Sequence, residues 1–355
     1  MIREEDQDSV QMMNANVADV LDAVAAPSHP GDGIVFVSDA DARALLEWPA
    51  MIDAIRRIYA VPHSADVSPP RVMARAPGIW MRTLTGLDPT GRFMGVKQFG
   101  LSRQRRLQYL ISLFDQETGR IVALLDAGSV TAFRTAATTA VALDRMARPG
   151  AATLGMVGSG GEAYTHARAI HAVRPLARLT VFSRNPERRA AFASAFEAET
   201  GVSSVAVDSA EAAVRGQDMV IGATNATGTI PIIRGEWLCP DAVLASIGAT
   251  LPEQCEVDVT VLDQAGLIVA DVPEEVLDTG CSRAAAASGV ALEGKIVTLN
   301  ALVLGQLDAR LRECRYPVYR SVGGPLQDIA IATLAFERAV ATGAARSLPI
   351  SFTTK

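Results

Sequence analysis

The sequence predicts an α/β protein with two domains. After Pro149 and Gly150, short apolar segments recur and most of them alternate with helical segments, which is typical of a parallel sheet covered on both faces. Residues 70–125 instead hold several segments of β-strand composition, two of them separated by the hairpin-like turn DQETGR, which favours a smaller α+β domain. A chain of 355 residues is long enough to bury a core of this size.

The first 150 residues add a helical extension, a strand followed by a helix, and a buried helix to this plan. Residues 8–25 place apolar side chains at helical spacing, and the segment APSHPGDG then reads as a break. Residues 1–33 are therefore predicted to be a helical extension that packs on the body or on a second subunit, with a partner-binding arm as the alternative. The segment GIVFVSDADARALL predicts a strand and then a helix capped by Ser38 or Asp39. Residues 129–147, rich in alanine, predict a buried helix.

The second half supplies the repeating strands and helices. Its strand-like segments are TLGMVG, LTVFSR, SVAV, DMVIGAT, AVLASIG and GLIVAD. Helical composition is found in NPERRAAFASAFEAE and SAEAAVRG, and the tail QDIAIATLAFERAVATGAA is again helical.

Composition excludes several classes of protein. The net charge of -6 argues against a nucleic-acid partner, and no apolar run reaches the ~20 residues of a membrane span. The acidic N-terminus has no apolar signal-peptide core, which predicts a cytoplasmic location. Four widely spaced cysteines and four histidines predict free thiols and no metal site.

A glycine-rich turn follows the first strand of the second half. The segment TLGMVGSGGEA runs from an apolar strand through Gly158 and Gly160 to Ala163, at the start of a helix. A GxGxxA pattern in this context predicts a Rossmann domain whose helix N-terminus holds the pyrophosphate of a dinucleotide. The residues assigned to the turn are Gly158, Ser159, Gly160, Gly161, Glu162 and Ala163; Thr224, after a later strand, is added to the cofactor site.

The end of the next strand indicates which dinucleotide binds. It reads Ser183, Arg184, Asn185, with Arg188 one turn later, and it lacks the carboxylate that NAD sites use for the ribose hydroxyls. A guanidinium here suits a 2′-phosphate, so NADP(H) is favoured over NAD(H). In the alternative interpretation, Arg184 only stacks on adenine and Asn185 only caps the next helix.

A longer pattern resembles the ornithine cyclodeaminase/μ-crystallin family. It is carried by TAFRTAATTAVALDRMARPGAATLGMVGSGGEA, SPPR, GVK, LFDQETGRIVALLD, ASIGATLPEQCEVD and SVGGPLQD, in this family's order. The resemblance implies a Rossmann domain at 148–315 and a substrate-binding and dimerisation domain made of 34–147 with 316–355. It also implies a homodimer that acts on small imino, amino or 2-oxo acids.

The resemblance places three cations around the substrate carboxylate, Arg71, Lys97 and Arg134. Such cations would orient a 2-imino acid for hydride attack, and a desolvated Lys97 could move the imine proton. Arg134 lies in an apolar Ala/Thr helix, where an unpaired guanidinium is costly, which favours a bound anion. On the same helix, Thr135 and Thr138 contact cofactor or substrate, or else bond back to the helix backbone.

The sequence departs from the cyclodeaminase pattern at Thr250, where those enzymes carry a catalytic aspartate. A hydroxyl does not serve as a carboxylate base at neutral pH, so Thr250 favours imine reduction, as in the μ-crystallin type. Trp80 and Arg82 also replace a Met-Pro-Ala-like segment, and FGLSRQRR, which includes Arg103, replaces an asparagine-containing one. These changes indicate an unusual substrate side chain, either larger or anionic.

The sequence thus predicts an NADP(H)-dependent reductase of imino acids with Lys97 and Thr250 as catalytic residues. The substrate-binding residues are then Arg71, Lys97, Arg134, Trp80 and Arg82. Two alternatives stay open: a cyclodeaminase with recycled NAD, and a crystallin-like protein that binds ligands without turnover.

Overall fold

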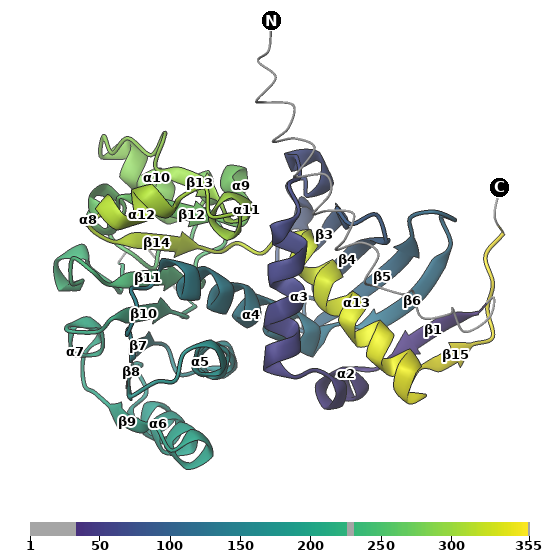
Figure 1. Ribbon diagram of the computed structural model, residues 1–355, viewed down its shortest axis with the longest axis horizontal. Coiled ribbons are helices and arrows are strands. Elements are labelled where there is room, and N and C mark those ends of the chain that lie inside the picture. Colours follow the sequence, from purple (N-terminus) through teal and green to yellow (C-terminus); the bar gives the residue numbers. More distant parts are fainter. Residues whose placement is uncertain (1–32, 226–230, 354–355) are drawn as a thin grey trace, which may run out of the picture.

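The computed structural model describes residues 33–225 and 231–353. They form two sheets on opposite sides of the long helix α4 (Gly128–Met146), which leads from one sheet into the other (Figure 1). The predicted α/β class is confirmed. The predicted helical extension, residues 1–33, lies outside the described residues except for Gly33.

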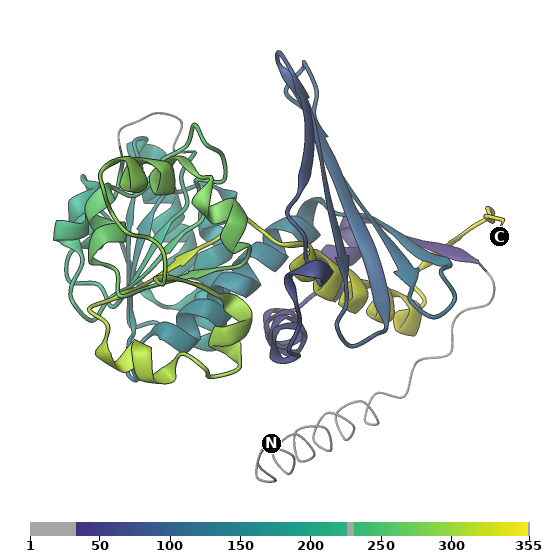
Figure 2. The same ribbon diagram turned by 90° about the horizontal axis from the view of Figure 1, so that it is seen from above.

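The first sheet is mixed, because β1 runs parallel to β6 whereas the other neighbours are antiparallel. Its described strands, in spatial order, are β15 (Arg346–Leu348), β1 (Ile34–Val37), β6 (Ile121–Asp126), β5 (Leu107–Asp115), β4 (Phe93–Leu101), β3 (Ile79–Leu87) and β2 (Val72–Ala76). Figure 2 shows the sheet edge-on, with helices against one of its faces.

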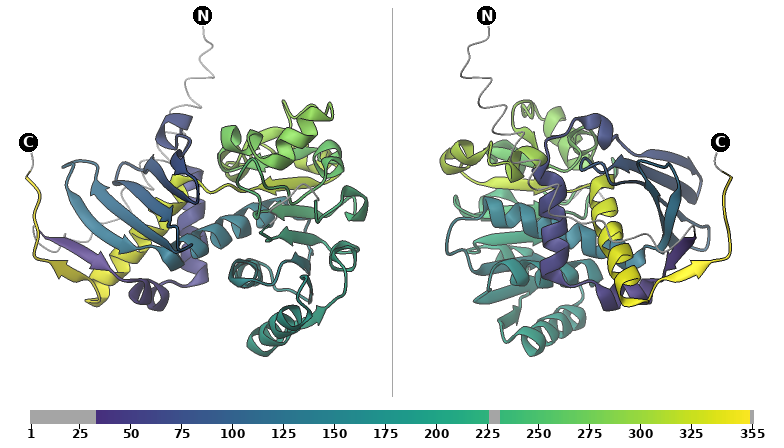
Figure 3. Two further views of the ribbon diagram at one scale, coloured as in Figure 1. Left: turned by 180° about the vertical axis from the view of Figure 1, so that it is seen from behind. Right: turned by 45° about the vertical axis from the view of Figure 1, so that its right-hand side comes forward.

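Helices from both ends of the chain cover that face. Helix α13 (Pro325–Thr342) packs across β3, β4 and β5, and α3 (Trp48–Ala60) lies beside it (Figure 3). Helix α2 (Asp39–Leu45) begins at Ser38, whose Oγ accepts a hydrogen bond from the backbone N–H of Asp41 at 3.2 Å. Of the two predicted caps, Ser38 is therefore the one used. A 3-10 turn, η1 (Ala65–Val67), leads toward β2.

The second sheet is parallel throughout its described strands. Their spatial order is β13 (Ile296–Thr298), β12 (Leu267–Ala270), β14 (Pro317–Arg320), β11 (Val243–Ser246), β10 (Met219–Gly222), β7 (Thr153–Val157), β8 (Arg178–Phe182) and β9 (Ser203–Ala206). The chain moves outward from β7 to β8 and β9, then returns to β10 on the other side. Ligands of such sheets bind beyond the carboxyl ends of the strands at this reversal.

Most of the connections in this half are helical. They are α5 (Gly161–Val173), α6 (Pro186–Thr200), α7 (Ala210–Val214), η2 (Gly235–Trp237), α8 (Val259–Gln264), α9 (Pro273–Leu277), α10 (Gly280–Ala287), α11 (Leu299–Val303) and α12 (Asp308–Glu313). Because helices cover both faces, β10, β11, β12 and β14 are buried along their whole length, as continuous apolar strands predict.

The predicted division at residues 315/316 is wrong in one respect. Strand β14 was assigned with the tail of the chain to the substrate domain, but it pairs with β11 and β12 in the parallel sheet. The chain returns to the first sheet only after Arg320, through residues 321–324. The division followed from the family resemblance, and a strand of only four residues that ends in a buried arginine does not read as one of the continuous apolar strands of the second half.

Within the described residues, no helix is both long and apolar enough to cross a membrane. The same part of the chain contains no cluster of three or more His, Cys, Asp or Glu side chains able to hold a metal ion.

Candidate active site

The glycine turn after β7 has the geometry that a dinucleotide requires. Gly158 has φ +125, and a Cβ atom there would lie 2.3 Å from the carbonyl oxygen of Ala223, so the position admits only glycine. Around Gly160 and Gly161 the space is open, and α5 begins at once, with its first N–H groups free of partners inside the helix. Ala163 is fully buried against the sheet. These residues fit a pyrophosphate at the helix N-terminus.

The end of β8 faces the same turn. The Ser159 hydroxyl donates to Ser183 Oγ at 2.7 Å, and Asn185 caps α6 by accepting from the Arg188 N–H at 2.8 Å. The side chains of Arg184 and Arg188 are exposed and have no ion-pair partner among the described residues. Two guanidinium groups are thus available beside the position that a ribose 2′ substituent takes in this fold.

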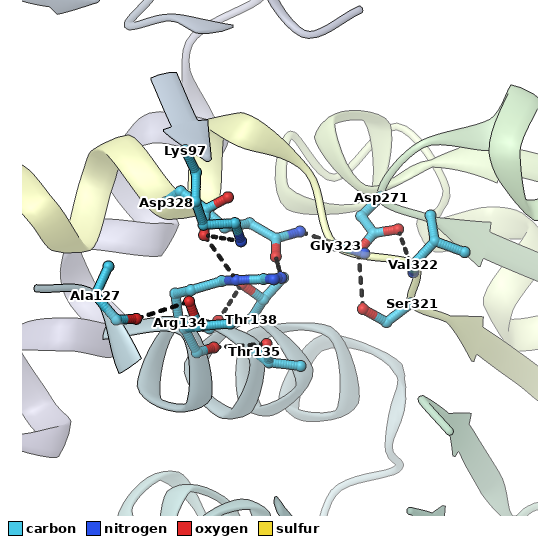
Figure 4. Close-up of polar contacts among 12 residues, drawn as sticks. Lys97, Ala127, Arg134, Thr135, Thr138, Asp271, Ser321, Val322, Gly323 and Asp328 are labelled. Carbon is cyan, nitrogen blue, oxygen red and sulfur yellow. Dashed lines mark hydrogen bonds and ion pairs between the residues drawn. The ribbon is translucent and has the colours of Figure 1, made fainter. Parts of the chain in front are cut away.

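Two buried cations share one carboxylate where the helices of the first domain meet (Figure 4). Lys97 of β4 places Nζ 2.7 Å from Oδ1 of Asp328, and Arg134 of α4 places Nε 2.9 Å from the same oxygen. Arg134 Nη1 also donates to Gln327 Oε1 at 2.8 Å. Asp328 Oδ2 is buried without a hydrogen-bond partner in the described structure. The sequence interpretation placed Lys97 and Arg134 together, and the structure does so through Asp328.

This cluster carries one net positive charge when Lys97 is protonated. Burial and, to a smaller extent, the charge of Arg134 lower the pKa of Lys97 to about 7, although the ion pair with Asp328 opposes the change. Desolvation outweighs the ion pair, so the lysine is poised to exchange a proton near neutral pH. An added anion would neutralise the cluster and favour the protonated lysine.

The loop at 321–324 brings the cluster to the parallel sheet. Asp271, just after β12, accepts hydrogen bonds from the N–H groups of Val322 at 3.0 Å and Gly323 at 2.9 Å. It also accepts from Gln327 Nε2 at 3.0 Å, and Gln327 in turn holds Arg134. On the cofactor side, Glu162 of α5 lies within electrostatic range of Arg134 and Lys97. The cation cluster therefore lies within electrostatic range of Glu162, a residue of the glycine turn.

Arg71 approaches this loop from the other side. Its Nε lies 2.5 Å from Oε2 of Glu275 in α9, and its Nη2 donates to the carbonyl oxygens of Val322, at 2.5 Å, and Gly323, at 3.0 Å. Arg71 thus lies near Arg134 but is already paired with Glu275. Of its three guanidinium nitrogens, only Nη1 has no hydrogen-bond partner among the described residues.

Trp80 and Arg82 lie side by side on β3. The guanidinium carbon of Arg82 is 4.6 Å from the centre of the Trp80 ring. Arg82 is buried, and it sits on the face of the sheet that also carries Lys97. Arg103, in contrast, is exposed in the turn between β4 and β5, away from this cluster.

The remaining predicted residues have partners of their own. The hydroxyl of Thr135 donates to Thr131 O at 2.8 Å, and that of Thr138 donates to Arg134 O at 2.7 Å, which is the back-bonded alternative. Both the N–H and the hydroxyl of Thr224 donate to Glu256 Oε1 at 2.8 Å. Thr250 stands in the loop after β11, and no contact among the described residues joins it to Lys97.

Sequence reasoning missed the carboxylates that organise the site, namely Asp271, Glu275, Glu256 and Asp328. Asp328 lies within the segment SVGGPLQD, which the family resemblance includes, but an acid in the first turn of a helix is ordinarily explained by the helix dipole. Glu256 is fully buried, and it accepts hydrogen bonds from Thr224 and, at 3.1 Å, from the N–H of Gly248. It therefore positions the two loops that follow β10 and β11.

A sequence model of the ornithine cyclodeaminase/mu-crystallin family matches residues 93–343. The chain belongs to this family. Delta(1)-pyrroline-2-carboxylate reductase of Paracoccus denitrificans is 30% identical over 307 residues, which cover 84% of this chain and 95% of that relative. Ketimine reductase mu-crystallin of Mus musculus, another relative, is 29% identical over 231 residues, 65% of this chain and 69% of its own.

A solved structure with this family's fold agrees with the architecture. Delta(1)-pyrroline-2-carboxylate reductase of Thermococcus litoralis, in complex with NADH and L-proline, superposes with a TM-score of 0.82 at 25% identity, covering 89% of this chain and 100% of that chain. The predicted resemblance and the predicted Rossmann-type domain are confirmed.

We expect Gly323→Ala to disturb the cation cluster. Gly323 has φ +84, and a Cβ atom there would lie 2.5 Å from Arg134 Nη1. Gly343 has a similar φ of +73 with open space around it, so Gly343→Ala measures the backbone strain alone. Strain costs about 1–2 kcal/mol in both variants, and the displaced guanidinium adds about 1–3 kcal/mol in Gly323→Ala. Urea unfolding measures the loss in the free energy of unfolding for each variant. Equal losses in Gly323→Ala and Gly343→Ala would contradict the close packing of Arg134 on Gly323.

Proposed function

We propose that this chain is an NADP(H)-dependent reductase of imino acids, which saturates a C=N bond beside a carboxylate. The observation that carries the proposal is the pair of buried cations, Lys97 and Arg134, within electrostatic range of Glu162 in the glycine turn. Two cations with a single carboxylate suit a ligand that brings one more negative charge. A proton donor poised near neutral pH suits a reaction that adds a proton to nitrogen.

The enzyme class predicted from the sequence, an NAD(P)H-dependent oxidoreductase acting on CH–NH or C=N groups, is confirmed by the reductases among the relatives. Those relatives are a pyrroline-2-carboxylate reductase and a ketimine reductase. A nicotinamide dinucleotide as cofactor agrees with the solved complex with NADH. For this chain, small imino or 2-oxo acids are the proposed substrates, in line with those names.

In the proposed reaction, Arg134 and Lys97 hold the substrate carboxylate and fix the neighbouring carbon. When bound, the dinucleotide supplies the hydride that this carbon receives. Lys97 gives a proton to the imine nitrogen, so that one C–H bond and one N–H bond form as the π bond of C=N is lost. Thr250 bonds the nitrogen or an ordered water. Arg71 joins the carboxylate through Nη1, while Glu275 keeps the rest of its guanidinium in place.

Cyclodeamination is less well supported by these residues. Thr250 stands where cyclodeaminases carry an aspartate, and Asp328, the carboxylate beside Lys97, is already shared by two cations. A binding protein without turnover would not need a lysine whose pKa lies near neutral pH.

We also propose that the chain forms a homodimer through the face of the first sheet opposite α13. Val72, Met81 and Leu110 share this face in the strand register and are exposed, at 74%, 52% and 39%. An apolar face of a sheet normally packs against another element. Light scattering tests this directly, and a monomeric mass at micromolar concentration would contradict it.

The function is tested by NADPH oxidation with a panel of 2-oxo acids and amines and with cyclic ketimines. We expect oxidation with at least one carboxylate-bearing imine, and Arg134→Ala to lower kcat/KM by about 100-fold or more, because a buried charge pair with the substrate is lost. Arg56→Ala, which removes a half-exposed surface ion pair with Asp144, is the control. Ammonia release from ornithine without net oxidation would identify a cyclodeaminase instead. Ligand-induced thermal shifts without turnover would identify a binding protein.

The preference for NADPH is expected to depend on Arg184. Its guanidinium is exposed and without an ion-pair partner in the described chain, so it is free to pair with a 2′-phosphate. We expect Arg184→Ala to raise the KM for NADPH by about 10-fold and to leave that for NADH nearly unchanged. Arg178→Ala, at an exposed position on the opposite end of the same strand, is the matched control. An equal change for both cofactors would support stacking on adenine.

Lys97 is expected to give opposite pH dependences to the two directions of the reaction. Reduction needs the protonated amine, so its kcat/KM falls as pH rises through about 7, the lowered pKa of Lys97. Oxidation of the amino acid needs the neutral amine, so its kcat/KM rises over the same range. Initial rates between pH 5.5 and 9 measure both. In Lys97→Arg the guanidinium stays protonated over this pH range. A change of kcat/KM near pH 7 that persists in this variant belongs to another group.

A further inference from the structure

Of the four predicted substrate-binding cations, Arg82 is the one without an ion-pair partner among the described residues. Arg71 is paired with Glu275, and Lys97 and Arg134 share Asp328. The Arg82 side chain contacts Met73 Sδ through Nε at 3.3 Å and the rings of nearby aromatic residues, but Nη1 and Nη2 have no hydrogen-bond partner in the described chain. The residue is nonetheless only 6% exposed.

The strand register places Arg82 next to the carboxylate-binding cations. Leu84 pairs with Lys97 across β3 and β4, and Arg82 pairs with Phe99 one step further along the same face. Phe99 lies between the two charges: its ring centre is 5.3 Å from Lys97 Nζ and 6.0 Å from the guanidinium carbon of Arg82. Diagonal neighbours on a sheet are within reach of one ligand.

Aromatic side chains hold Arg82 in position. Its guanidinium lies over Trp80 at 4.6 Å, Trp80 meets Phe99 edge-on at 5.5 Å, and Phe99 stacks on Tyr109 at 5.0 Å. A cation fixed over aromatic rings keeps its hydrogen-bond donors free for an incoming group.

The environment of Arg82 disfavours its charge. Burial, with a smaller contribution from the positive charge of Arg71, lowers the pKa of Arg82 to about 10, although the more distant carboxylates of Glu275 and Glu253 oppose the change. The guanidinium is still protonated at neutral pH. A buried cation without a counter-ion is costly, so an anion that binds beside it is strongly stabilised.

We propose that Arg82 binds a second acidic group at the far end of the substrate, so that the preferred substrates are dicarboxylic 2-imino acids. This inference rests on the proposed imino acid reductase function. The first carboxylate binds Lys97 and Arg134, and the second lies across Phe99 and binds the two free Nη donors of Arg82 in the bidentate manner that arginine favours. A substrate with an apolar side chain leaves Arg82 unpaired.

The test compares matched pairs of substrates on the full-length protein with NADPH. Oxaloacetate and 2-oxoglutarate, each with ammonia, form dicarboxylic imines; pyruvate and 2-oxobutyrate with ammonia form monocarboxylic ones. We expect the wild type to prefer the dicarboxylic pair. Arg82→Met should lower that preference by about 100-fold, mainly through KM, because one partner of a buried charge pair is removed. Arg57→Met, 60% exposed on α3, should keep the preference of the wild type.

The outcomes separate the two proposals. The role given to Arg82 would be overturned if Arg82→Met lowered kcat/KM equally for dicarboxylic and monocarboxylic imines. It would also be overturned if the wild type showed no preference for dicarboxylic imines. Neither result would contradict imine reduction itself. If no imine is reduced, the proposed function fails, and thermal shifts with succinate and butyrate in the presence of NADPH still test Arg82. A shift with succinate that is larger than with butyrate and absent in Arg82→Met supports the second acid site; equal shifts contradict it.

Discussion

The shared carboxylate of Asp328 is the interaction on which the arrangement of the site depends. It joins β4, α4 and α13, three segments far apart in the sequence, through Lys97 and Arg134. Without it, two like charges would lie together in a space that excludes water, at a cost of about 3–5 kcal/mol for an uncompensated buried charge. With it, the repulsion is reduced but one positive charge remains. In the proposed reaction, the carboxylate of the substrate neutralises this remaining charge.

A second buried carboxylate determines where Asp328 stands. Asp271 follows β12 in the parallel sheet, and it accepts hydrogen bonds from Ser321 at 2.8 Å, from two backbone N–H groups of the loop at 321–324 and from Gln327. That loop ends where α13 begins. The parallel-sheet domain thus sets the start of α13, the helix that carries Asp328. One hydrogen-bond network therefore positions the cation cluster relative to the glycine turn.

The sequence predicts those parts of the fold that repeat a simple pattern. The buried parallel strands are continuous apolar runs between helices, and the glycine turn is specified by steric need at Gly158. The family resemblance located Arg134, and its position in an apolar helix indicated that its guanidinium requires an anion. Strand β14 was not predicted, because it ends in Arg320, which is wholly buried although arginines are ordinarily exposed.

The site itself was predicted only in part, for a related reason. Pattern matching locates a residue but not the partner of its side chain. Arg71, predicted as a free cation, is engaged by Glu275, and the hydroxyl of Thr224 turns to Glu256. These partners come from loops whose course is set by tertiary packing, and no local spacing in the sequence connects Arg71 with a residue in α9 or Thr224 with one beyond β11.

The insertion of β14 between β11 and β12 has a mechanical consequence. The chain passes from one domain to the other twice, once along α4 and once through residues 321–324, so the two halves are tethered at two points. Any rotation of one domain relative to the other must therefore turn about an axis through both connections. Arg134 sits on one and Gly323 on the other, in contact with each other. For the proposed function, the residues that connect the two domains are therefore also the residues that bind the substrate carboxylate, so a rotation of the domains that releases the product would also weaken the binding of its acid group.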